Sequence, residues 1–162
     1  MDLNRFKCIN DSLGRAVGDR VLQSVARRLM AGVRDSDTVS RQGGDEFIVL
    51  LSEAACAEDA AFSADKLLAA TAVPHRIDDQ DLHVTASVGI GLYATDGTDA
   101  GKILKKTDLA LLVARRHRPA WAALAMPAAT ASQVASNASR VKAAPDGSQF
   151  PARASACSTS WE

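Results

Sequence analysis

The stretch RDSDTVSRQGGDEFIVLL, residues 34–51, restricts the possible folds more than any other part of the chain. Its two β-rich runs, TVSR and FIVLL, flank the pair Gly43-Gly44, and this pattern predicts a β-hairpin. Two adjacent carboxylates, Asp45 and Glu46, follow the glycines at the tip. Taken alone, such a pair is more often a solvated acidic turn than a chemical site. The rest of the sequence has to decide between the two interpretations.

Composition excludes several classes of protein. The 162 residues suffice for one domain with a core, and the formal net charge of zero gives no basic excess for nucleic acid or an anionic membrane. The longest apolar runs are far shorter than the roughly 20 residues of a membrane span, and the polar start MDLNRFKCIND is unlike a signal peptide. Cys8, Cys56 and Cys157 lack CxxC spacing, which argues against a disulfide framework or a zinc site. We expect a cytoplasmic protein with Cys8 and Cys56 as small buried fillers.

The composition changes near Pro119. Residues 1–118 combine charges of both signs with periodic apolar positions, whereas residues 119–162 are rich in Ala, Ser and Pro. Such a tail lacks the side chains needed to build a core. We expect residues 1–118 to form one domain and residues 119–162 to be disordered or translated out of frame, with one short helix near AWAALAM, residues 120–126.

Helices and strands alternate along the globular part. Apolar residues at helical spacing predict helices over residues 18–33, 58–72 and 99–116, the last with Ile103, Leu104, Leu111 and Ala114 on one side. Alternation predicts a half-buried strand over residues 82–94, with residues 75–78 pairing with it. The pattern favours an α/β (α+β) sandwich, in which flanking helices pack on a mixed central β-sheet.

Polar residues near the start of the chain bear on the acidic hairpin tip. Asp2 ends a short strand, and if that strand neighbours the hairpin, its carboxylate converges with Asp45 and Glu46 into an oxygen-ligand set suited to Mg²⁺. Asn10 and Asp19 offer the donors and acceptors that a purine edge requires. Lys7 and helix-start N–H groups can hold phosphate. The alternative for Asn10 and Asp19 is helix capping.

Taken together, these segments resemble a known family. In order and spacing, DLNRFKCIND, GRAVGD, RDSD, GGDEF, VTASVGIG and KILKKTDLALLVAR resemble the GGDEF domain of diguanylate cyclases over residues 1–116. The resemblance implies a nucleotidyl-cyclase, palm-like fold. Here the first central strand is truncated, an N-terminal LTGLPNR-like segment is missing, and the C-terminal end diverges, with Leu112, Arg115 and Pro119 where the family has Tyr, Lys and Arg.

The resemblance also implies an activity. Family members condense two GTP into cyclic di-GMP and release pyrophosphate, as homodimers that use Mg²⁺ or Mn²⁺. It implies an upstream sensor or receiver module, which can make the domain the cytoplasmic part of a membrane-bound sensor. Asp45 and Glu46 are then the catalytic pair, and the metal ligands are Asp2, Leu3 (through its carbonyl), Asp45 and Glu46. The substrate-binding residues are Lys7, Asn10, Asp19, Arg41, Gly43, Gly44 and Arg115.

The segment RDSD is an RxxD motif at the position where the family keeps its product-inhibition site. The resemblance implies that Arg34 and Asp37 bind cyclic di-GMP there. Asn4 stands where the family usually has a second Asp. The alternative function is a catalytically inactive GGDEF module that binds GTP or cyclic di-GMP and regulates a partner.

Overall fold

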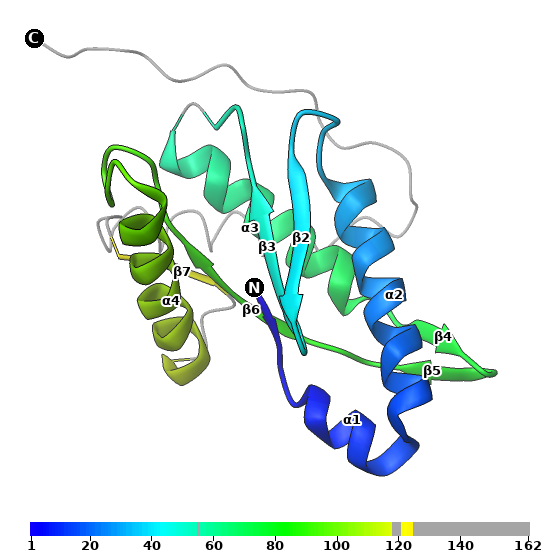
Figure 1. Ribbon diagram of the computed structural model, residues 1–162. Helices are drawn as coiled ribbons and strands as arrows, with labels where there is room; N and C mark the ends of the chain where they lie inside the picture. Colours follow the sequence, from blue (N-terminus) through cyan, green and yellow to red (C-terminus); the bar gives the residue numbers. More distant parts are fainter. Residues whose placement is uncertain (55, 118–120, 125–162) are drawn as a thin grey trace, which may run out of the picture.

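The computed structural model describes residues 1–54, 56–117 and 121–124, which form a mixed five-stranded β-sheet with helices packed against it and a separate two-stranded sheet (Figure 1). Within those residues the helices are α1 Phe6–Leu13, α2 Arg15–Gly32, α3 Ala57–Ala72 and α4 Ala100–His117. The strands are β1 Asp2–Leu3, β2 Thr38–Gly43, β3 Glu46–Leu50, β4 His75–Ile77, β5 Gln80–Leu82, β6 Ala86–Ile90 and β7 Trp121–Ala123. The three long helices predicted from the sequence are confirmed.

The shortest strand lies at the centre of the sheet. The strand order is β2-β3-β1-β6-β7, and the pairs are antiparallel apart from β6 and β7, which run parallel. In β1, Asp2 lies opposite Glu46 of β3 on one side and opposite Ser87 of β6 on the other. The predicted mixed sheet is confirmed, and β1 pairs with β3, which meets the condition under which the carboxylates of Asp2, Asp45 and Glu46 were expected to converge.

The helices cover the two faces of the sheet. Successive residues of a strand point to opposite faces, and on β6 Ile90 is buried against Ala60 and Ala64 of α3, while Ala86 belongs to the core that includes α2. On the other face a Cβ at Gly89 would come within 2.1 Å of the Thr107 carbonyl oxygen of α4. The helices α2 and α3 therefore cover one face and α4 the other, as Figure 1 shows.

Several local predictions were wrong. Residues 75–77 pair with β5 in a separate two-stranded hairpin, because the expected strand over 82–94 is broken and only residues 86–90 join the main sheet. Leu104 lies on the solvent side of α4 and is 43% exposed. Cys8 is exposed and Cys56 is half-buried, so neither is a buried filler.

The segment after Pro119 also departs from expectation. Trp121–Ala123 form strand β7, whereas an Ala-rich helix was predicted there. Hydrogen bonding to the open edge of β6 outweighs the helical preference of alanine, and the Trp121 side chain anchors the strand by donating to Asp65 Oδ1 at 2.8 Å. The rest of the predicted tail, together with residues 118–120, lies outside the described residues. No helix among the described residues is long and apolar enough to cross a membrane.

Candidate active site

Asp2 is the centre of the candidate site. Its strand lies between β3 and β6, and this position leaves the residue 3% exposed. The guanidinium of Arg115, on α4, lies 3.4 Å from Oδ2, whereas Oδ1 is buried with no hydrogen-bond partner. A buried carboxylate with an unsatisfied oxygen is costly unless a cation compensates it. This oxygen therefore marks a place for a further ligand.

Electrostatic forces on Asp2 act in both directions. Burial raises the pKa of Asp2 above its ordinary value, and Arg115 opposes that rise by stabilising the charged form. The neighbouring carboxylates of Asp45 and Glu46 raise the pKa further, while the Met1 ammonium lowers it. The carboxylates of Asp2, Asp45 and Glu46 thus repel one another, and a cation placed among them lowers the free energy of the site.

The hairpin tip brings its acidic residues to β1. Glu46 lies directly opposite Asp2, so the two side chains leave the same face of the sheet. The Leu3 amide donates to the Asp45 carbonyl oxygen at 3.2 Å, which fixes the tip against β1. Asp45 is half-buried and Glu46 is exposed. The structure therefore places the backbone of Asp2 and Leu3 beside that of Asp45 and Glu46.

The two glycines of the tip have conformations that few other residues adopt. Gly43 has φ 146° and Gly44 has φ 53°, and an added Cβ would meet no atom within 4 Å at either position. The backbone conformation, together with the open space beside it, explains glycine here. Arg41 braces this turn, because its Nε and Nη2 donate to the Gly44 carbonyl oxygen at 3.0 and 2.8 Å.

The donor set fits a hard divalent cation that takes few ligands from the protein. Among the described residues, no group of three or more His, Cys, Asp or Glu side chains is already arranged to hold a metal ion. Mg²⁺ commonly binds one or two carboxylates and completes its shell with water and substrate phosphates. Asp2 with its unpaired Oδ1, and Asp45 or Glu46 at the adjacent strand end, satisfy that requirement.

The residues predicted to read guanine lie at the junction of α1 and α2. Asn10 is half-buried on α1 and packs closely on α2, where a Cβ at Gly18 would lie 1.9 Å from the Asn10 Oδ1 atom. Gly18 is therefore required for this close approach. Asp19 follows it on α2 and is exposed, as is Lys7 on α1.

Sequence reasoning missed the role of Asn4. Its side chain accepts from Ser87 Oγ at 3.1 Å and donates to Thr85 Oγ1 at 3.2 Å, and its amide donates to the Thr85 carbonyl oxygen at 2.8 Å. These bonds anchor the end of β1 to β6 beside Asp2. Such long-range partners leave no local signal in the sequence, although an Asn in place of the family Asp marked the position as unusual.

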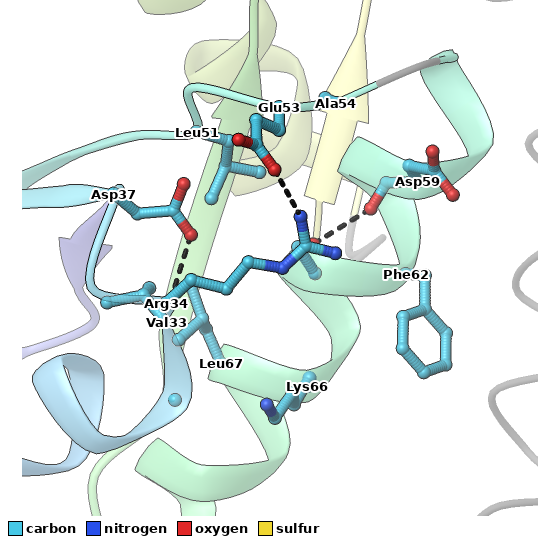
Figure 2. Close-up of a pocket in the computed structure, with 12 residues that line it drawn as sticks. Val33, Arg34, Asp37, Leu51, Glu53, Ala54, Asp59, Phe62, Lys66 and Leu67 are labelled. Atoms are coloured by element: carbon cyan, nitrogen blue, oxygen red, sulfur yellow. Dashed lines mark hydrogen bonds and ion pairs between the residues drawn. The ribbon is translucent and has the colours of Figure 1, made fainter. Parts of the chain in front are cut away.

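The RxxD motif lines a separate pocket, which Figure 2 shows, and β2 runs from this pocket to the glycine turn. The six residues of β2 separate it from the glycine turn by roughly 20 Å. The cavity has a volume of about 210 Å³ and is bounded by the end of α2, the end of the hairpin and one side of α3.

The two motif residues differ in what they offer to a ligand. Asp37 accepts from the backbone amides of Arg34 and Ser52, both at 3.0 Å, so its carboxylate shapes the loop. Arg34 extends into the pocket and pairs with Glu53 at 3.4 Å, as Figure 2 shows. Sequence reasoning missed Glu53, which lies 19 positions further along the chain.

Comparison with known proteins gives a consistent result. The sequence profile of the family described as "Diguanylate cyclase, GGDEF domain" matches residues 1–119. The signaling protein YkoW of Bacillus subtilis is 42% identical over 118 residues, which cover 72% of this chain and 15% of YkoW. The diguanylate cyclase TpbB of Pseudomonas aeruginosa is 40% identical over 118 residues, covering 72% of this chain and 27% of TpbB.

A solved structure shows the same fold. The crystal structure of the GGDEF domain of TpbB (YfiN) superposes with a TM-score of 0.69 at 40% sequence identity, and the match covers 72% of this chain and 73% of that one. The chain spans 15% of the length of YkoW and 27% of the length of TpbB. The similarity therefore concerns one domain of larger proteins.

Proposed function

The chain belongs to the GGDEF domain family of diguanylate cyclases, and on that premise we propose that it condenses two GTP molecules into cyclic di-GMP in the presence of Mg²⁺ or Mn²⁺. The observation that carries the proposal is the buried Asp2, whose Oδ1 lacks a partner beside the acidic hairpin tip. A purely structural acidic turn gives no reason to bury a third carboxylate next to it.

The proposed reaction is a nucleotidyl transfer between two GTP molecules, one in each subunit of a homodimer. The ribose 3′ oxygen of one GTP attacks the α-phosphorus of the other, the bond to the β-phosphate breaks, and pyrophosphate leaves. The same transfer in the opposite direction closes the ring. Asp45 accepts the 3′ proton, and Glu46 lies beside it.

The remaining residues bind and position substrate. Asp2, the Leu3 carbonyl, Asp45 and Glu46 are the proposed metal ligands, and a bound metal supplies neutralisation of phosphate charge and activation of the 3′ hydroxyl. Asn10 and Asp19 hold the guanine edge. The open space at Gly43 and Gly44 admits the phosphates to the backbone. Lys7, Arg41 and Arg115 add positive charge around the triphosphate.

Product inhibition is proposed for the RxxD pocket. Arg34 points into the cavity and carries donors for a guanine or phosphate oxygen, while Asp37 holds the loop in shape. Since the pocket lies at the far end of the hairpin from Asp45, cyclic di-GMP bound there acts at a distance from the reacting atoms.

The direct test incubates the purified chain with GTP and Mg²⁺ and separates the products by chromatography. We expect cyclic di-GMP and pyrophosphate from the unaltered chain, and none from Asp45→Ala. Glu58→Gln, an exposed carboxylate at the start of α3, is the matched control and should leave the rate unchanged. Product formation that survives Asp45→Ala would contradict the proposed site.

The alternative function is a module that binds GTP or cyclic di-GMP without catalysis and regulates a partner. The observation that favours it is the ion pair of Arg115 with Asp2, which occupies one oxygen of the proposed metal ligand. Under this alternative the chain forms no product, yet calorimetry detects GTP or cyclic di-GMP binding that Asn10→Ala or Arg34→Ala removes.

A further inference from the structure

We propose that Arg115 is a place-holding counter-ion: it neutralises Asp2 while the site holds no metal, and it releases the carboxylate when a divalent cation binds. The inference rests on the metal-binding part of the proposed function. In this role Arg115 is a positioning residue that acts as the counter-ion of Asp2 before substrate binds.

The two partners of the Asp2–Arg115 pair differ in burial and in mobility. The Asp2 side chain is 4% exposed and is fixed by a strand hydrogen-bonded on both sides, whereas the Arg115 side chain is 47% exposed on α4. The contact is a single Nη1–Oδ2 approach of 3.4 Å, not the two parallel bonds of a strong guanidinium–carboxylate pair. The carboxylate cannot leave, but the guanidinium can swing into solvent.

Charges of both signs surround Asp2. Asp45 and Glu46 add negative charge, and the Met1 ammonium adds positive charge while donating to the Phe47 carbonyl oxygen at 2.9 Å. Among the described residues, Arg115 makes the one ion pair with the Asp2 side chain. Removal of Arg115 without replacement leaves a buried carboxylate uncompensated.

Arg115 and a divalent cation compete for the Asp2 carboxylate. A guanidinium and a divalent cation on the same carboxylate repel each other, and the burial of the Asp2 carboxylate limits how far water can screen that repulsion. The apparent affinity for metal is therefore reduced by the fraction of molecules in which Arg115 holds Asp2. Once the metal displaces it, the freed guanidinium lies beside the proposed phosphate site, so that metal and nucleotide each favour the binding of the other.

The test measures metal binding without nucleotide. Mn²⁺ is titrated into the purified chain at mildly alkaline pH, and free Mn²⁺ is followed by electron paramagnetic resonance. We expect Arg115→Gln to bind Mn²⁺ more tightly by about 5- to 30-fold, the range that one or two kcal/mol represents. Arg116→Gln removes the same charge from the next, exposed position of α4 and should change the affinity little. Equal or weaker binding by Arg115→Gln overturns the proposal.

A second measurement uses the unaltered chain and so does not depend on the folding of a variant. An arginine-specific reagent is applied with and without Mg²⁺, and modification is quantified by peptide mass spectrometry. We expect Mg²⁺ to increase the modification of Arg115 severalfold while that of Arg116 stays constant. Modification of Arg115 that is unchanged or reduced by Mg²⁺ contradicts displacement.

These outcomes are separable from the proposed function. A chain that binds metal as described but forms no cyclic di-GMP refutes the cyclase and leaves the counter-ion role intact. A chain that forms cyclic di-GMP, while Arg115→Gln binds Mn²⁺ no more tightly, refutes the counter-ion role alone.

Discussion

Two arginine–carboxylate pairs lie at opposite ends of the hairpin, with the same separation and different surroundings. Arg115 and Asp2 approach to 3.4 Å, as do Arg34 and Glu53. The Asp2 side chain is 4% exposed, whereas Glu53 is 69% exposed and Arg34 is 51% exposed. Distance alone would rank the two pairs as equal.

The two ion pairs differ in how easily their partners separate, because only Asp2 is buried. Water readily replaces either partner of the Arg34–Glu53 pair, so that pair contributes little and yields easily to a ligand. Water cannot replace the cation beside Asp2 in this way, because the Asp2 carboxylate is desolvated. It therefore needs a cation at all times. At the glycine-turn end of the hairpin, Arg115 can leave Asp2 only when another cation replaces it. At the other end, Arg34 can leave Glu53 without a replacement.

The largest expected effect is loss of activity when the buried charge is removed. Asp2→Asn keeps the shape but removes a proposed metal ligand, and the several kcal/mol that a metal contributes to phosphoryl transfer correspond to a rate loss of about 10³-fold or more. The rate of cyclic di-GMP formation measures it, with thermal melting as the check on folding and Glu58→Gln as the control. An active Asp2→Asn chain would remove the functional contrast between the two ends.

The second effect is on stability. Arg115→Met leaves Asp2 buried without its counter-ion and should lower the free energy of unfolding by about 1–2 kcal/mol. Arg34→Met breaks an exposed pair and should change it by at most about 0.5 kcal/mol. Urea unfolding of both variants tests the ranking. Equal losses would show that burial does not separate the pairs.

Much of this arrangement was readable from the sequence. The hairpin followed from Gly43-Gly44 between two β-rich runs, and the three long helices followed from their apolar spacing, because both signals are local. The neighbourhood of Asp2 and the hairpin required only that the first strand pair with the hairpin, and in the structure Asp2 lies opposite Glu46.

What could not be predicted depends on contacts between distant parts of the chain. Nothing local in Arg115 or Glu53 identifies an ion-pair partner 113 or 19 residues away. The same holds for β7: an Ala-rich segment has helical propensity, and only the open edge of β6 with Asp65 as a partner for Trp121 turns it into a strand. Tertiary pairing overrides propensity in such cases.

A smaller expected effect is the pH dependence of stability that the buried His75 causes, at a site separate from both ion pairs. His75 is fully buried and faces Ser24, the Thr71 carbonyl oxygen and Arg28. Burial lowers its pKa, Arg28 lowers it further, and the Thr71 bond opposes them. Folding therefore favours the neutral form of His75 over the protonated form.

The sign of the expected change follows from that preference. Below the ordinary histidine pKa of about 6.5, His75 takes up a proton more readily in the unfolded chain than in the folded one. The contribution of His75 to the free energy of unfolding is therefore complete above that pH and is lost as the pH falls. The loss has a limiting slope of about 1.4 kcal/mol per pH unit. The test is to measure the free energy of unfolding in urea across this pH range for the unaltered chain and for His75→Gln. The variant should lack the pH dependence that His75 causes and should keep the pH dependence that the carboxylates cause. Parallel pH profiles for the two proteins would contradict it.

The smallest effect concerns the exposed pair itself. Glu53→Gln removes the carboxylate that Arg34 contacts, so Arg34 becomes more available to cyclic di-GMP, and the product concentration that halves the rate should fall by up to about fivefold, since exposed pairs contribute little. Arg34→Ala should abolish the inhibition, and Glu58→Gln should not move it. Weaker inhibition in Glu53→Gln would mean that Glu53 binds the product or shapes the pocket. Glu53 would then not be a competitor for Arg34, and the two ends of the hairpin would no longer differ in how easily an arginine is released.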